Sequence, residues 1–301
     1  MADAATQAPG TRDAPKRSVS RRASFAWLGV LPFFIFSAAF LFLPVAFLVT
    51  GSFQATDGSL TVQNYADLSD PYLVDAFRTS IEISAITAIA GGIFGLLLAY
   101  SVILGGLPDI LRSALMTFSG VASNFAGVPL ALAFAFTLGN LGLVTRLVFD
   151  VTGVRITDGF SLGTKLGLEI VYLYFQFPLM VLIIAPALAG LRKDWREAAE
   201  NLGASPWQYW RHVALPVLMP SILGAIVLLF GNAFGAQATA YQLTGGLINI
   251  VTLVITAQIR GDVLHNPGLG YAVAMGMVVI IGISILFYSM LQRRSERWLR
   301  G

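Results

Sequence analysis

The stretch IVYLYFQFPLMVLIIAPALAGL, residues 170–191, contains no Asp, Glu, Lys or Arg. A helix needs about 20 predominantly apolar residues to cross the hydrocarbon core of a bilayer. The stretch therefore predicts a transmembrane helix, which we place at residues 167–190. The segment that follows, residues 192–216, is basic and rich in tryptophan, and it predicts a loop at the membrane surface.

Apolar runs on either side of this helix extend the same pattern over most of the chain. The 301 residues are 56% apolar and only 12% charged, whereas soluble domains carry about 25% charged residues. Residues 247–259 are too short to cross and predict a re-entrant or cavity-lining helix. We therefore predict an all-α transmembrane protein over residues 24–291. Its six crossings are placed at residues 25–50, 79–104, 113–137, 167–190, 217–236 and 270–291.

Basic residues predict the orientation, because cytoplasmic loops carry an excess of Lys and Arg. With six crossings and a cytoplasmic N-terminus, 14 of the 19 basic residues lie inside. Both termini are then cytoplasmic, with a disordered tail at residues 1–23 and a second tail at residues 292–301. The basic residues left outside are Arg78, Arg146, Arg155, Lys165 and Arg260.

The composition also argues against several classes of function. The chain has no Cys, and its two His residues, His212 and His265, are far apart in sequence. We therefore predict no metal site, no catalytic residues and no cofactor bound by this chain. A phosphate-binding GxxxxGK[ST] motif is also missing from the sequence. The net charge of +3 is explained by the basic residues that collect on the cytoplasmic side of a membrane protein, and it does not indicate a nucleic-acid partner.

The loop RKDWREAAENLGASPWQYWRHVALP, residues 192–216, predicts two short helices joined by a tight turn. Asp194 followed three residues later by Glu197 is typical of a capping box that starts the first helix. Gly203 predicts the left-handed residue that ends it.

The second helix of the loop has start and stop signals of its own. Ser205, Pro206 and Gln208 predict its capped start, and Pro216 predicts its end before the fifth crossing. From the residues alone, a pair of interfacial helices anchored by tryptophans explains the loop as well as a protein-docking site does.

The loop resembles the signature of binding-protein-dependent ABC importer permeases, which is EAA, three residues, G, nine residues and I-x-L-P. Valine in place of isoleucine is the one departure. Thr244-Gly245-Gly246 is similar to the branch that imports polyamines, ferric iron, thiamine and phosphonates. Residues that match the signature are Glu197, Ala198, Ala199, Gly203, Val213, Leu215 and Pro216.

The resemblance implies the six-crossing type I ABC importer permease fold and a location in the bacterial plasma membrane. It implies three protein partners, namely a cytoplasmic ATPase dimer that uses ATP and Mg, a second permease subunit, expected to be a paralogue, and an extracytoplasmic substrate-binding protein. The residues expected to couple the chain to the ATPase are Glu197, Ala198, Ala199, Gly203, Leu215 and Pro216.

Ionisable residues inside membrane spans are candidates for function. Glu82 and Glu169 each follow a cation by four residues, Arg78 and Lys165 respectively. The pairs predict either structural i,i+4 ion pairs or an acidic entrance for a cationic substrate. A polar cluster at the end of the fifth span adds further pathway candidates, namely Asn232, Gln237, Tyr241 and Gln242.

Together these patterns predict one permease subunit of an ATP-driven importer for a small solute. A polyamine or another cationic molecule is the preferred substrate. The alternatives are a permease for phosphonate, ferric iron or thiamine, and an ion-coupled secondary transporter. A close helix contact is also predicted at Gly91 and Gly95, which form a GxxxG pattern in the second span.

Overall fold

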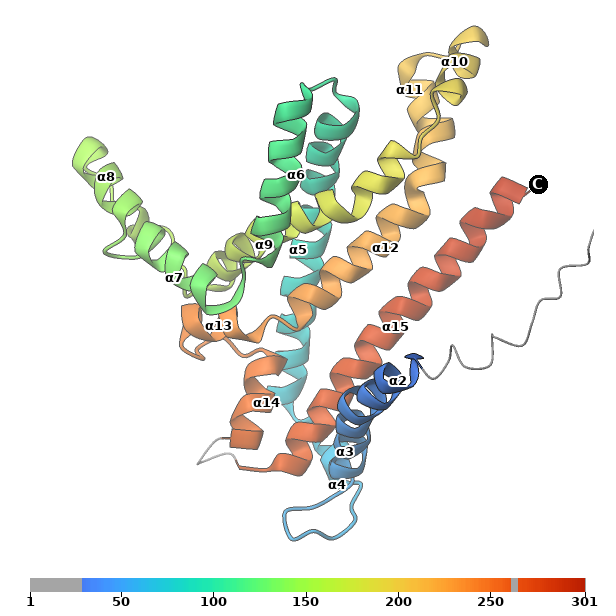
Figure 1. Ribbon diagram of the computed structural model, residues 1–301. Coiled ribbons are helices and arrows are strands. Elements are labelled where there is room, and N and C mark those ends of the chain that lie inside the picture. Colours follow the sequence, from blue (N-terminus) through green and yellow to red (C-terminus); the bar gives the residue numbers. More distant parts are fainter. Residues whose placement is uncertain (1–28, 261–264, 301) are drawn as a thin grey trace, which may run out of the picture. The chain divides into compact units, whose positions relative to one another are not determined.

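The computed structural model describes residues 29–260 and 265–300, so the predicted tail at residues 1–23 lies outside the described part (Figure 1). Contacts divide the chain into two units, residues 1–47 and residues 48–301. The described part of the first unit holds α2 (Leu31–Ser37), the π-helical turn η2 (Ala38–Phe42) and the start of α3 (Leu43–Ser52), whose last five residues belong to the second unit. Neither α2 nor η2 contains a buried residue, as expected for a helix that faces lipid.

The second unit is helical, and the β structure among its described residues is a single isolated bridge. In chain order its elements are α4 (Gln63–Ala66), η3 (Asp67–Ser69), α5 (Pro71–Leu104), α6 (Asp109–Asn124), α7 (Gly127–Leu138), α8 (Leu143–Thr152), η4 (Ile156–Asp158), α9 (Lys165–Ala189), α10 (Lys193–Asn201), α11 (Pro206–Tyr209), η5 (Trp210–Ala214), α12 (Leu215–Phe234), α13 (Gln237–Thr244), α14 (Val251–Arg260) and α15 (Pro267–Arg300).

Six helical segments are long and apolar enough to cross a membrane, which confirms the predicted number. The third differs in position, because it lies at Gly127–Thr152 instead of residues 113–137. The predicted helix is broken at Phe125 and Ala126, whose backbones are not helical. Gly127 has a φ of +72°, and Pro129 has no N–H to bond the carbonyl of Phe125. These features divide the segment into α6 and α7.

Helix α9 lies at the centre of the unit, between α5, α6 and α12, and it is the most buried of the six candidate spans. The predicted contact at Gly91 and Gly95 of α5 is confirmed. A Cβ atom on Gly91 would lie 2.6 Å from Gln176 Cβ, and one on Gly95 would lie 2.5 Å from Met180 Cβ. The side-chain amide of Gln176 also donates to the Leu229 carbonyl of α12 at 2.9 Å. Small residues on α5 therefore let three helices meet closely.

Side-chain hydrogen bonds fix the short helices beside this bundle. The Tyr172 hydroxyl of α9 donates to the Ala236 carbonyl at 2.5 Å, just before α13. The backbone N–H of Val251 donates to Ser80 Oγ at 2.9 Å, which attaches α14 to α5. Helix α14 covers residues 251–259 of the predicted re-entrant segment 247–259, extends one residue beyond it to Arg260, and has ten residues. That length is too short to cross a bilayer, and its re-entry stays a prediction.

Candidate functional site

The first helix of the loop, α10 (Lys193–Asn201), starts two residues earlier than predicted. Its N-cap is Arg192, whose side chain donates to Asp194 Oδ2 at 2.6 Å. The predicted capping box at Asp194 and Glu197 is therefore wrong, because Asp194 lies inside the first turn and bonds Arg192 instead of a backbone N–H. A carboxylate in the first turn still stabilises the helix through the helix dipole.

The end of α10 is the predicted glycine turn. Gly203 has a φ of +80°. Its N–H donates to the Glu200 carbonyl at 2.9 Å, and the N–H of Ala204 donates to the Ala199 carbonyl at 3.0 Å. These two bonds, from the first and second residues after the cap, form a Schellman motif. Glycine is therefore favoured at position 203, because the left-handed backbone conformation is unfavourable for residues that carry a Cβ atom.

The second helix of the loop begins with the predicted capping box. Gln208 N–H donates to Ser205 Oγ at 3.3 Å, and Ser205 N–H donates to Gln208 Oε1 at 2.7 Å. The predicted stop at Pro216 is wrong, because α11 continues through η5 into α12. Pro216, which has no N–H to donate, directly follows this π-helical turn.

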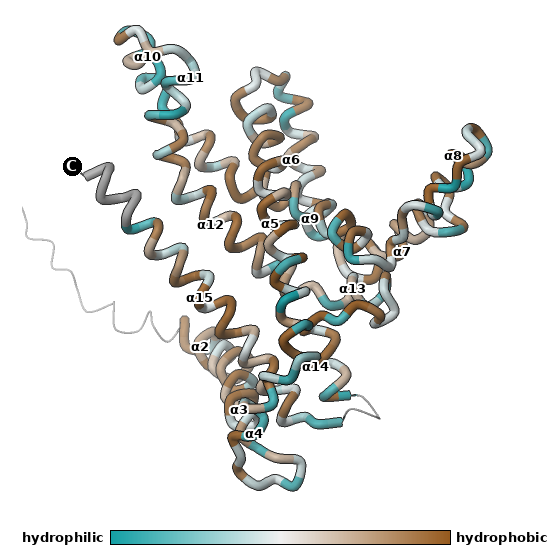
Figure 2. Tube along the Cα trace, turned by 180° about the vertical axis from the view of Figure 1, so that it is seen from behind, coloured by the Kyte–Doolittle hydropathy of each residue, from teal (hydrophilic) through white to brown (hydrophobic). Residues whose placement is uncertain are grey.

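The loop has a fixed base and an exposed tip. At the base, Tyr209 is buried and the Trp210 ring packs edge-on to Tyr100 of α5, with ring centroids 5.2 Å apart. At the tip, Glu197 is exposed and Leu202 is 88% exposed. Figure 2 shows several hydrophilic residues around α10 and α11, whereas α12 is mostly hydrophobic. The tip thus offers a rigid, uncovered surface within the described part of the chain.

The ion pairs of the candidate entrance differ from the prediction. Lys165 Nζ lies 2.5 Å from Glu82 Oε1, so the lysine pairs across helices with α5. The predicted pairs Arg78–Glu82 and Lys165–Glu169 do not form between these described residues. Side chains point toward the N-terminus of their helix, so Lys165 at the start of α9 extends away from Glu169. Glu169 Oε1 is buried and has no hydrogen-bond partner among the described residues.

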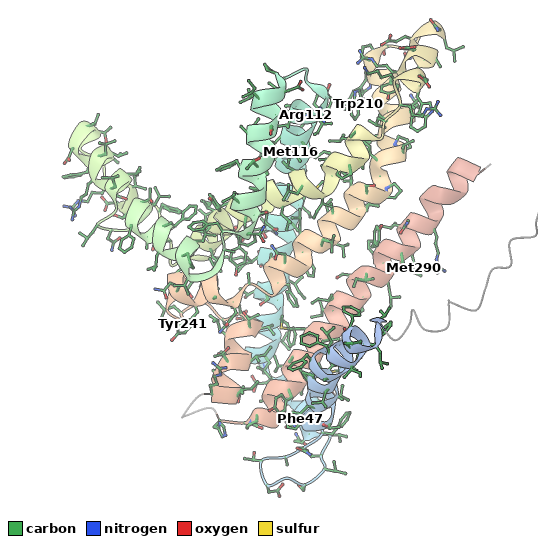
Figure 3. The ribbon with its side chains drawn as sticks, viewed as in Figure 1. Phe47, Arg112, Met116, Trp210, Tyr241 and Met290 are labelled. Carbon is green, nitrogen blue, oxygen red and sulfur yellow. The ribbon has the colours of Figure 1, made fainter. Side chains whose placement is uncertain are left out.

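The residues of the predicted polar cluster at the end of α12 do not lie together in the structure. The Gln237 side-chain amide donates to Thr256 Oγ1 at 2.9 Å, joining α13 to α14. Tyr241 lines a cavity of about 280 Å³ together with Thr256 and Arg260. Figure 3 shows Trp210 and Tyr241 near opposite ends of α12.

Two predicted pathway residues, Asn232 and Gln242, are exposed and lie outside this set of contacts. Arg260, in contrast, lines the cavity without having been predicted to do so. A signal for it was present in the sequence, because Arg260 is the charged residue that ends the apolar segment 247–259.

Comparison with known proteins identifies the family of the chain. Residues 91–297 match the family described as binding-protein-dependent transport system inner membrane component. The chain belongs to this family. It is the permease subunit of an ABC importer and a multi-pass protein of the bacterial inner membrane.

Relatives of this permease have different named substrates. It is 27% identical over 246 residues to a probable sulfate transport system permease protein, cysT, of Nephroselmis olivacea, with 79% of this chain and 80% of the relative covered. It is 25% identical to the spermidine/putrescine permease PotB of Haemophilus influenzae, with 88% and 90% covered. It is also 25% identical to the sulfate permease CysT of Escherichia coli, with 89% and 92% covered.

A solved structure supports the fold of the permease. The chain superposes with a TM-score of 0.71 on a bacterial ABC transporter involved in the import of the acidic polysaccharide alginate. The two chains are 18% identical, and the match covers 91% of this chain and 96% of that one. The fold predicted from the loop and the six spans is therefore confirmed.

Proposed function

We propose that this permease carries a small solute from an extracytoplasmic binding protein to the cytoplasm, driven by an ATPase dimer that docks on the tip of the loop 192–216. The observation that carries the proposal is the exposed, doubly capped turn around Gly203. A docking joint has to keep its shape while force passes through it, and two capped helices on a buried base have that property.

Each coupling residue has a part in this proposal. Glu197 and Ala198 are exposed on α10 and Leu202 is exposed at its C-cap, and all three contact the ATPase directly. The Ala199 carbonyl accepts the hydrogen bond from Ala204 that holds the turn. Gly203 sets the turn, whereas Leu215 and Pro216 begin the helix that receives the force. ATP and Mg are bound by the ATPase, and nucleotide binding there shifts the permease between its inward-open and outward-open states.

The same proposal assigns the remaining partners and the orientation. A second permease subunit, a paralogue, completes the pathway, and both termini of the chain lie in the cytoplasm. The 14 basic residues that this orientation places inside support it.

For the cargo we propose a polyamine or a similar small cation. The likeness to a spermidine/putrescine permease over 88% of the chain supports it, as does the unpartnered oxygen of Glu169. Glu82 adds less than expected, because Lys165 neutralises its charge. The sulfate permeases among the relatives support a second candidate, an oxyanion, and Arg260 in the lining of the cavity supplies positive charge for it.

Reconstituted uptake tests these proposals. The complete transporter, with its ATPase, paralogous permease and binding protein, is placed in vesicles and supplied with labelled spermidine or labelled sulfate. We expect ATP-dependent spermidine uptake that falls in Glu169→Gln and is retained in Glu82→Gln. Uptake of sulfate alone would select the second candidate. Uptake that continues without the ATPase would overturn the ATP-driven mechanism in favour of ion coupling.

A further inference from the structure

A cavity of about 410 Å³ lies beneath the loop, where α5 and α12 diverge toward α10 and α11 (Figures 1 and 2). Near the middle of the unit the two helices touch, because a Cβ on Gly92 would lie 3.0 Å from Ile226. Toward the loop the same faces separate, and Leu188 of α9 closes the cavity between them. The walls are almost entirely apolar, including Leu96, Leu218 and Ile222.

The end of the cavity next to the loop, which we call its mouth, differs in composition from the rest of the lining. Trp207 and Trp210 of the loop lie there with Tyr100, whose ring packs on Trp210, and Trp207 is 71% exposed. Tyrosine and tryptophan collect at the headgroup level of a bilayer, because each has an apolar ring with one polar atom. The mouth therefore lies at the membrane surface, while the walls extend into the depth of the acyl chains.

One positive charge is part of the lining. Arg211 lines the cavity and forms no ion pair among the described residues, whereas Arg192 and Arg196 of the same loop are paired with carboxylates. The lining contains no Asp or Glu, so nothing within it neutralises Arg211. A basic residue at the rim of an apolar pocket between membrane helices matches the chemistry of an anionic lipid headgroup above an acyl chain.

We propose that this cavity binds an anionic phospholipid, with an acyl chain along Leu96, Leu218 and Ile222 and its phosphate against Arg211. The lipid lies directly under η5, the turn that joins the loop to α12. Binding there supports the base of the loop and makes its position sensitive to the anionic lipid content of the membrane. The proposal goes beyond ATPase docking and does not depend on it.

Tryptophan quenching provides a direct test, since Trp207 and Trp210 line the site. The full chain is placed in phosphatidylcholine nanodiscs, and dibrominated phosphatidylglycerol is added in increasing mole fraction. We expect saturable quenching at low mole fraction. Arg211→Gln should raise the half-saturating mole fraction about fivefold, the effect of one basic residue near an anionic surface. Both leaflets of a nanodisc are equivalent, so the result is independent of orientation and of the ATPase.

Two controls make the result specific. Arg112→Gln removes a cation from α6, outside the cavity lining, and should titrate as the unchanged chain does. Leu97→Phe fills part of the cavity from a half-exposed position and should weaken quenching without loss of charge.

Several outcomes would overturn the proposal. Equal quenching by dibrominated phosphatidylcholine would show ordinary lipid contact. Equal half-saturating mole fractions for Arg211→Gln and Arg112→Gln would show that Arg211 does not bind the headgroup of the lipid. Loss of quenching when the second permease subunit is added would show that a protein surface fills the cavity instead.

Discussion

Replacing Gly203 by alanine tests whether the shape of the loop turn, and not its side chains, holds the ATPase. Gly203 has a φ of +80°, and no heavy atom lies within 4 Å of the place that an alanine Cβ would take, so the methyl group meets no obstacle. The whole cost is conformational, about 1–2 kcal/mol for an L-residue in left-handed geometry. In the proposed joint, docking has to hold the turn in this conformation, so the conformational cost is subtracted from the free energy of ATPase binding. The affinity for the ATPase should therefore fall about 5- to 30-fold.

The assay measures binding of the ATPase to the permease in detergent, followed by ATP-driven uptake in vesicles. Gly153→Ala is a matched control, because Gly153 ends α8 with a φ of +72° and also has open space around it. Gly203→Asn is the second comparison, since Asn tolerates left-handed geometry better than Ala does. We expect Gly153→Ala to leave ATPase binding unchanged and Gly203→Asn to bind more tightly than Gly203→Ala.

Two results would refute this reasoning. If Gly203→Ala binds the ATPase as the unchanged permease does, the turn is not part of the joint. If Gly203→Asn binds more weakly than Gly203→Ala, the size of the side chain matters and the backbone conformation does not.

The helix contacts and caps can be tested in the same way. Gly95→Ala should destabilise the fold by about 1–3 kcal/mol, because the new methyl lies 2.5 Å from a side chain of α9. The control Gly120→Ala, whose methyl lies in open space, should leave the thermal unfolding temperature unchanged or raised. Equal unfolding temperatures for the two variants would contradict the close contact. Ser205→Ala removes the cap of α11 at a cost of about 1 kcal/mol, so amide exchange at Gln208 should accelerate, and an unchanged exchange rate would argue against the capping box. Lys165→Met should leave the unfolding temperature nearly unchanged, because the pair with Glu82 is half exposed, and a large decrease would show that the pair supports the fold.

Local patterns were the most predictable part of the molecule. The number of apolar spans and the place of five of them follow from hydropathy, and the Gly203 turn and the Ser205 cap follow from residues within a few positions of each other. The GxxxG contact was also predictable, because missing side chains leave space whichever helix fills it.

The partner of a residue in another segment could not be predicted, nor could the places where a helix breaks or continues. The partner of Lys165 depends on how α9 lies against α5, and the spacing in sequence favoured Glu169 instead. The break between α6 and α7 needed both Gly127 and Pro129, and each is tolerated alone in many membrane helices. The course of the chain past Pro216 depended on a π-helical turn, which has no sequence signal of its own.

The unbroken passage from α11 through η5 into α12 has a mechanical consequence. Residues Pro206–Phe234 form one continuous helical segment of 29 residues that includes the π-helical turn and Pro220, about 40 Å along its length at 1.5 Å per residue. A tilt of ~5° about one end of a helix of that length displaces the other end by ~4 Å, by simple geometry. The far end leads directly to Gln237 and Tyr241. Under the proposed docking of the ATPase, a small tilt at the loop is therefore enlarged along this helix before it reaches Gln237 and Tyr241.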